Sequence, residues 1–127
     1  MKTILVDAVN ALVSEVGEID QQMLVILDKF PNNKIILTGA NDEQFKKFGL
    51  DKMPYEVFTL KHDPEKTDPA YFTKMLAHFN LTADDVVYFE HNPDATKSAQ
   101  SVGIPTMFYD YDKKDYSALE KFISENI

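Results

Sequence analysis

The sequence has no cysteine, no arginine and no apolar run long enough to cross a membrane. Without cysteine the chain can form neither disulfides nor thiolate metal sites, so we expect a cytoplasmic protein. A membrane-spanning helix needs about 20 consecutive apolar residues, and the longest runs here are far shorter. The first residues also lack the long apolar segment and small-residue cleavage site of a secretory signal.

The charge balance is equally one-sided. All 13 basic residues are lysines, and 21 acidic residues give a formal net charge of -8. Proteins that bind nucleic acid normally present a basic surface and use arginine to grip phosphates and guanine edges. We therefore expect no nucleic-acid or membrane partner, and we interpret the acidity as favouring solubility.

The 127 residues are enough for one domain with a proper core and too few for two ordinary ones. Strand-like segments lie at residues 3–7, 34–40, 55–60, 85–90 and 104–110. Several of them are continuous apolar runs, which are typical of a parallel sheet covered on both faces. We predict a single domain over residues 1–127.

Helical patterns separate these strands. Apolar residues at helical spacing predict helices near 19–30, 41–48, 69–79, 93–102 and 117–124. Asn41, Asp68 and Asn92 are natural N-caps, and prolines follow the last two at the first helical position. Alternating strands and helices predict a three-layer α/β/α Rossmann-like fold with a mainly parallel five-stranded sheet.

In such folds ligands bind beyond the carboxyl ends of the strands, so the residues that finish each strand are the candidates for function. In chain order they are Asp7, Thr38, Gly39, Glu90 and Asp94. Lys66 lies just ahead of the third predicted helix, whose N-terminus favours anions. These residues together predict a place for a phosphoryl group and a divalent cation.

The chemistry explains the choice of residue types. A carboxylate such as Asp7 can attack phosphorus, but the two anions repel unless Mg²⁺ and a lysine neutralise them. Carboxylate oxygens suit Mg²⁺ better than histidines do. The Thr38 hydroxyl can hold a phosphoryl oxygen, and Gly39 lets the backbone approach it.

The segments "ILVD", "IILTG", "EKTDPAYFTKML" and "VVYFEHNPD" resemble motifs I to IV of the haloacid dehalogenase superfamily, in the same order and over essentially the whole chain. The resemblance implies that Asp7 is the nucleophile, that Thr38 binds phosphate and that Lys66 stabilises the charge. It also implies Mg²⁺ held by Asp7, the Val9 carbonyl, and Glu90 or Asp94. The substrate would be a phosphorylated small molecule or macromolecule.

The sequence departs from this family at Val9, where its phosphatases have a second aspartate. That aspartate protonates the leaving group, and losing a general acid commonly costs about 10²- to 10⁴-fold in rate. Asn10 replaces the usual glycine and tolerates a left-handed backbone. Glu90 is one methylene longer than the usual aspartate. Only short segments, 8–17 and 61–65, occupy the places where cap domains insert, so we expect a capless fold with an open site.

Two hypotheses from different classes remain. The first is a Mg²⁺-dependent phosphohydrolase, slow or restricted to good leaving groups such as aryl and acyl phosphates. The second is a catalytically silent relative that serves as a binding module. A response-regulator receiver would use similar residues, but their order along the chain is wrong.

Two further residues bear on the site. Lys61 competes with Lys66 for the phosphate-facing position, and the predicted helix behind Lys66 favours the latter. His91 can in principle replace the missing base, although a lone loop histidine is more often solvated. Oligomeric state is not predicted.

Overall fold

The computed structural model describes all 127 residues and contains one five-stranded sheet. Its strands are β1 (Thr3–Asp7), β2 (Lys34–Thr38), β3 (Glu56–Thr59), β4 (Val86–Glu90) and β5 (Thr106–Phe108). They lie in the order β3-β2-β1-β4-β5, and every neighbouring pair is parallel. The predicted parallel sheet is confirmed, although most strands are shorter than their predicted ranges.

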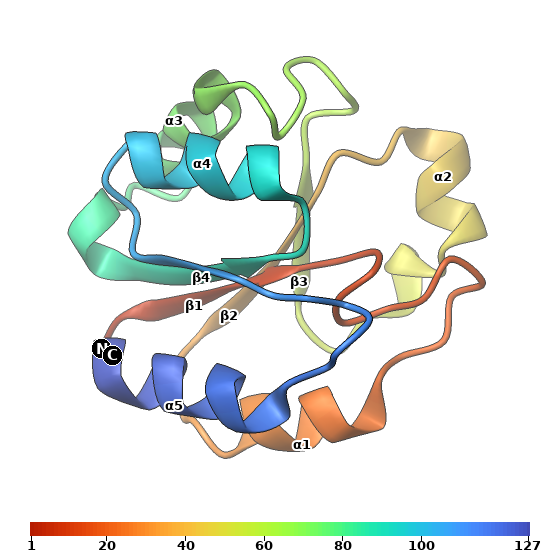
Figure 1. The fold of residues 1–127 in the computed structure, drawn as a ribbon. Coiled ribbons are helices and arrows are strands. Elements are labelled where there is room, and N and C mark those ends of the chain that lie inside the picture. The colour runs from red at the N-terminus through yellow and green to blue at the C-terminus, as the bar shows by residue number, and fades with distance from the viewer.

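Helices cover both faces of the sheet (Figure 1). One layer holds α1 (Gln21–Asp28) and α5 (Tyr116–Asn126), and the other holds α3 (Pro69–His78) and α4 (Pro93–Ser101). Two separate buried apolar clusters fill the spaces between the sheet and these layers. The three-layer α/β/α prediction is therefore confirmed.

A fifth helix, α2 (Asp42–Lys47), lies apart from both layers, near the carboxyl ends of the strands (Figure 1). Single 3-10 turns at Leu50–Lys52 and Ala83–Asp85 precede β3 and β4. None of the helices has the length and apolar character needed to cross a membrane.

Polar side chains cap the N-termini of α2, α3 and α4. The Asn41 side chain accepts a hydrogen bond from the Gln44 backbone amide, and the Gln44 side chain accepts one from the Asn41 backbone amide. Together they form the predicted capping box. Asp68 and Asn92 cap α3 and α4, each followed by proline at the first helical position. These caps fix the loops that lead from the sheet to its helices.

The topology concentrates polar residues at one edge. β1 is the central strand. The chain continues from β1 to β2 and β3 on one side and then crosses over to β4 and β5 on the other. The carboxyl ends of β1, β2 and β4 form the crevice at which doubly wound folds bind ligands. Only short loops follow β1 and β3, and residues 1–127 contain no cap domain over this crevice.

Candidate active site

Asp7 ends β1 as a buried carboxylate, 1% exposed. The Lys66 ammonium lies 2.7 Å from Asp7 Oδ1 and also donates to the Leu37 carbonyl on β2, at 3.2 Å. Lys66 is carried there by the segment that leads into α3. A buried carboxylate is stable only when it is compensated, and Lys66 supplies that compensation.

Glu90 ends β4 beside Asp7 and is equally buried. Its Oε1 lies 2.7 Å from Lys66 Nζ and accepts a short hydrogen bond from the Tyr88 hydroxyl. Its Oε2 accepts from the backbone amide of Asn92 at 3.1 Å. Lys66 therefore bridges two buried carboxylates, one from each of two adjacent strands.

His91 completes this arrangement. Its backbone amide donates to Asp7 Oδ2 at 2.9 Å, and its ring Nδ1 lies 2.5 Å from the same oxygen. Nδ1 also lies 3.2 Å from Glu90 Oε2. The side chain is 30% exposed, so the interpretation of His91 as a solvated loop residue is wrong. We call Asp7, Lys66, Glu90 and His91 the floor of the site.

The charges of the floor residues shift one another's pKa values. Burial lowers the pKa of Lys66, but the charges of Asp7 and Glu90 outweigh burial and raise it well above its usual range. Burial likewise lowers the pKa of His91, and its hydrogen bonds to both carboxylates raise it to about 10. Two carboxylates thus face two cations.

The two carboxylates differ. Burial raises the pKa of Glu90, but Lys66 and the hydrogen bonds around it hold the pKa well below the ordinary value. For Asp7, burial and the charge of Glu90 raise the pKa more than Lys66 and His91 lower it. At each carboxyl group burial thus opposes the compensation that Lys66 and His91 supply.

The floor opens into a cavity of about 210 Å³, lined on one side by Thr38 and Gly39. Thr38 Oγ1 accepts from the Ala40 amide at 3.2 Å, and the Tyr71 hydroxyl fixes the Thr38 carbonyl at 2.8 Å. Oγ1 donates no hydrogen bond within the chain, so the Thr38 hydroxyl proton is available to a ligand oxygen.

The loop after β1 presents Val9 to the cavity. Asn10 has a φ of 66°, so it adopts the left-handed conformation expected there. No hydrogen bond is accepted by the Val9 carbonyl oxygen, which leaves it available to a cation. The structure therefore brings Asp7, Thr38, Gly39, Lys66, Val9 and Glu90 together around one cavity.

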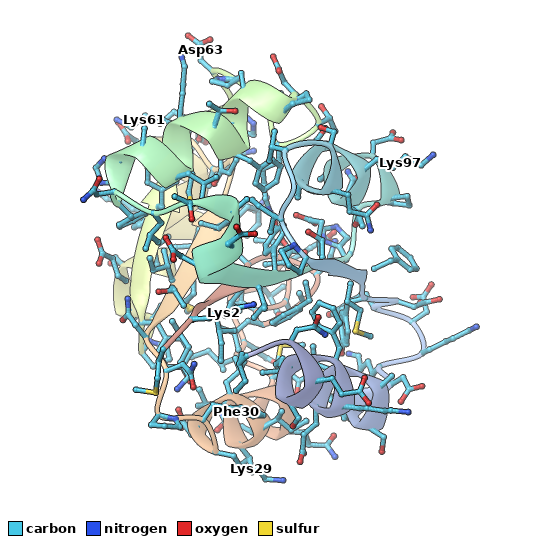
Figure 2. The ribbon with its side chains drawn as sticks, turned by 90° about the vertical axis from the view of Figure 1, so that its left-hand side faces the viewer. Lys2, Lys29, Phe30, Lys61, Asp63 and Lys97 are labelled. Atoms are coloured by element: carbon cyan, nitrogen blue, oxygen red, sulfur yellow. The ribbon has the colours of Figure 1, made fainter.

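Asp94 and Lys61 lie elsewhere. Asp94 is exposed in the first turn of α4 and does not line the cavity, because Asn92 caps the helix and turns Asp94 outward. Lys61 pairs with Asp42 on α2 at 3.0 Å and extends from the surface into solvent (Figure 2). Of the two competing lysines, Lys66 is the one that faces Asp7.

Sequence reasoning missed one group of residues that line the cavity. His62 lies in the loop after β3, where its Nδ1 is 3.0 Å from Glu65 Oε2 and its Nε2 is 2.5 Å from Gln44 Oε1. All three residues line the cavity, and we call them the rim. His62 and Glu65 lie three residues apart, but Gln44 lies 18 residues before His62, so no short sequence pattern connects all three. By contrast, Tyr88 was detectable, since residues two apart on a strand share a face and Tyr88 precedes Glu90 by two.

Comparison with solved structures identifies the fold. Over 94% of this chain and 98% of the other, the fold matches a HAD family enzyme, BT-2542 of Bacteroides thetaiotaomicron, in complex with magnesium and inorganic phosphate, with a TM-score of 0.75 at 14% identity. The core domain of a putative phosphoglycolate phosphatase from Streptococcus pneumoniae matches with a TM-score of 0.56 at 18% identity, over 85% of this chain and 79% of that one.

The fold is that of the haloacid dehalogenase (HAD) enzymes. A magnesium-bound phosphatase domain of the Bacteroides fragilis protein BF1531 shares it, with a TM-score of 0.58 at 12% identity, over 94% of this chain and 39% of that one. No protein-family model matches the chain, and no curated protein does. At these identities the likeness establishes the HAD-like fold, and the site itself must carry any statement about function.

Proposed function

We propose that this chain hydrolyses phosphate esters with Asp7 as the nucleophile. The observation that carries the proposal is the placement of Asp7. This carboxylate is buried at the end of the central strand, 2.7 Å from the Lys66 ammonium, on the floor of a cavity lined by Thr38 and Gly39. A carboxylate in such a place can attack phosphorus while a nearby cation balances the charge that develops.

The phosphoryl group would be held by Thr38 and Gly39, which line one side of the cavity. The Thr38 hydroxyl can donate to one phosphoryl oxygen, and the Gly39 backbone can approach another because glycine has no Cβ. Lys66 remains beside Asp7 throughout and offsets the approach of a dianion to a carboxylate. The open cavity admits either a small molecule or a phosphorylated group on a macromolecule.

The residues present fit a divalent cation. Asp7, the free Val9 carbonyl and Glu90 supply oxygen ligands of the kind that Mg²⁺ prefers. Mg²⁺ bound there would neutralise charge on the phosphoryl oxygens. Magnesium in two solved HAD-like neighbours supports this assignment. Asp94 is not in the proposed ligand set, because it does not line the cavity.

A second candidate is a catalytically silent module that binds a ligand in the same cavity. One observation favours it. Both floor carboxylates are already compensated inside the chain by Lys66 and His91, and Val9 cannot donate a proton to a leaving group. A site of this kind is stable without performing any reaction.

Turnover separates the two candidates. The test is release of phosphate from p-nitrophenyl phosphate and acetyl phosphate with Mg²⁺ present, for the unaltered protein and for Asp7→Asn. We expect hydrolysis that needs Mg²⁺ and falls at least about 10³-fold in the variant, as is found when a nucleophile is removed. Equal rates for two well-folded proteins would reject the hydrolase and favour the silent module.

A further inference from the structure

The proposed reaction lacks an obvious proton donor for the leaving group. Val9 lines the cavity at the position suited to this task, and its side chain carries no proton to give. Without protonation only good leaving groups depart readily. The inference below rests on the proposed function and concerns which residue of this chain supplies that proton.

The floor cations are poor candidates. Lys66 Nζ is held by Asp7, Glu90 and the Leu37 carbonyl at distances between 2.7 and 3.2 Å. His91 Nδ1 lies 2.5 Å from Asp7 Oδ2, on the side of the nucleophile. In an in-line displacement the leaving group departs on the side opposite the nucleophile. Lys66 and His91 therefore lie beside the nucleophile, away from the side on which the leaving group departs.

His62 on the rim has the required hydrogen-bonding state. Gln44 Oε1 accepts from the Asn41 backbone amide at 3.1 Å, which identifies this atom as the amide oxygen and not the nitrogen. His62 Nε2, 2.5 Å from the same oxygen, must therefore be a donor. Nδ1 faces the Glu65 carboxylate at 3.0 Å. Both ring nitrogens therefore face acceptor oxygens, an arrangement in which Nε2 can give a proton to a ligand oxygen while Nδ1 stays beside Glu65.

The His62 ring lies against the Thr38–Gly39 segment that would bind the phosphoryl group. A Cβ placed on Gly39 would lie 3.4 Å from His62 Nδ1, so the ring packs directly over the backbone that follows Thr38. Lys61 and His62 reach this position through two successive left-handed residues, with φ of 53° and 66°. Non-glycine residues adopt that conformation at a cost, and they are concentrated at ligand-binding sites.

We propose that His62 is the general acid and base of this site and that Glu65 is its positioning residue. As the Asp7 oxygen bonds to phosphorus, the bond to the leaving oxygen breaks and its electron pair takes the proton from His62 Nε2, which exchanges Gln44 for that oxygen. His62 is then neutral, with Nδ1–H still bonded to Glu65. Water next attacks the phosphoaspartate phosphorus and gives a proton back to Nε2. Inorganic phosphate and the Asp7 carboxylate are released.

The test is the dependence of kcat/KM on the leaving group. Rates are measured on 2,4-dinitrophenyl, p-nitrophenyl, phenyl and methyl phosphate for the unaltered protein, His62→Asn and Glu65→Gln. His78→Asn is the matched control, because His78 stacks on Phe58 and Phe79 away from the cavity. We expect His62→Asn to leave the dinitrophenyl ester within about twofold and to slow the phenyl and methyl esters by about 10²-fold. Glu65→Gln should show a smaller loss of the same kind.

Three outcomes would overturn the proposal. A loss in His62→Asn that is equal for all four esters would make His62 a binding residue only. No loss for any ester would mean that solvent supplies the proton. If no turnover depends on Asp7, the proposed function fails together with this inference, whereas Asp7-dependent turnover with an unchanged leaving-group dependence rejects the role of His62 alone.

Discussion

The floor and the rim of this cavity are built from different parts of the fold. The floor carboxylates end the strands β1 and β4, and the Asp7 and Glu90 side chains are at most 2% exposed. The rim comes from α2 and a short loop, and its His62 and Glu65 side chains are 37% and 55% exposed. Charge at the floor is part of the protein interior, whereas charge at the rim is in contact with water.

Burial determines how strongly a substitution at each place should affect stability. Removing one partner of a buried ion pair leaves an uncompensated charge, while an exposed pair contributes little. Substitutions at the floor should therefore alter folding and chemistry together. Substitutions of the exposed rim residues His62 and Glu65 should alter chemistry alone. Four variants test this distinction.

The largest effect is expected from Lys66→Met, which leaves Asp7 and Glu90 with His91 as their only cation. We expect the free energy of unfolding to fall by about 3–5 kcal/mol. Urea denaturation with an unchanged m-value measures it. The matched control is Lys61→Met on the surface, which should change stability by less than about 0.5 kcal/mol. Equal small losses in the two variants would show that the floor is not an interior ion cluster.

Val9→Asp places a carboxyl at the mouth of the floor, where the chain now has no proton donor. In the His62→Asn background we expect hydrolysis of methyl phosphate to rise by about 10²-fold, at the lower end of what general acids contribute. Val9→Asn is the matched control, because it is similar in shape and does not titrate. The gain should be smaller when His62 is present, because both groups would serve the same proton transfer. An unchanged rate in both backgrounds would place the deficiency elsewhere in the site.

The third effect concerns pH. In metal-free buffer the pKa of His91 is about 10 in the folded protein and near 6.5 when unfolded. A raised pKa stabilises the folded protein fully below the unfolded value, and this stabilisation is lost as pH rises through the folded value. The stability advantage over His91→Asn should therefore shrink by about 1–2 kcal/mol between those pH values, allowing for the exposed part of the ring. A pH-independent difference would show that the ring is neutral.

The smallest effect is expected at the rim. Glu65→Gln removes the charge that faces His62 but lies in contact with water. We expect the free energy of unfolding to change by less than about 0.5 kcal/mol. Thermal melts of the variant and the unaltered protein measure it. A loss as large as that of Lys66→Met would abolish the distinction between floor and rim.

The sequence predicted the floor better than the rim, and the reason is physical. Asp7, Thr38 and Glu90 follow apolar strands, so the sheet determines their positions. His91 was assigned to solvent because its contact with Asp7 depends on how the chain turns after β4. His62 depends on two left-handed residues and on a helix from another part of the chain. Patterns along a chain record periodicity, and they do not record such loop contacts.

Asp94 illustrates the same limit from the other side. Its spacing after Glu90 suits a metal ligand, but the residue that caps α4 decides where Asp94 points. Asn92 accepts from the amides of Asp94 and Ala95, which begins the helix with Asp94 exposed. A one-residue difference in the start of a helix rotates a side chain by about 100°.

The central position of β1 has a consequence for how the molecule forms. β1 pairs with β2, about 30 residues later in the chain, and with β4, whose first residue is Val86. During synthesis, the charge of Asp7 is compensated only after Lys66 and then His91 have been made. One edge of β1 also stays unpaired until β4 is made. Because pairing over such a sequence distance slows folding, the nascent chain is exposed to association with other chains over this interval. The candidate site is thus completed only after β4 and His91 have been made.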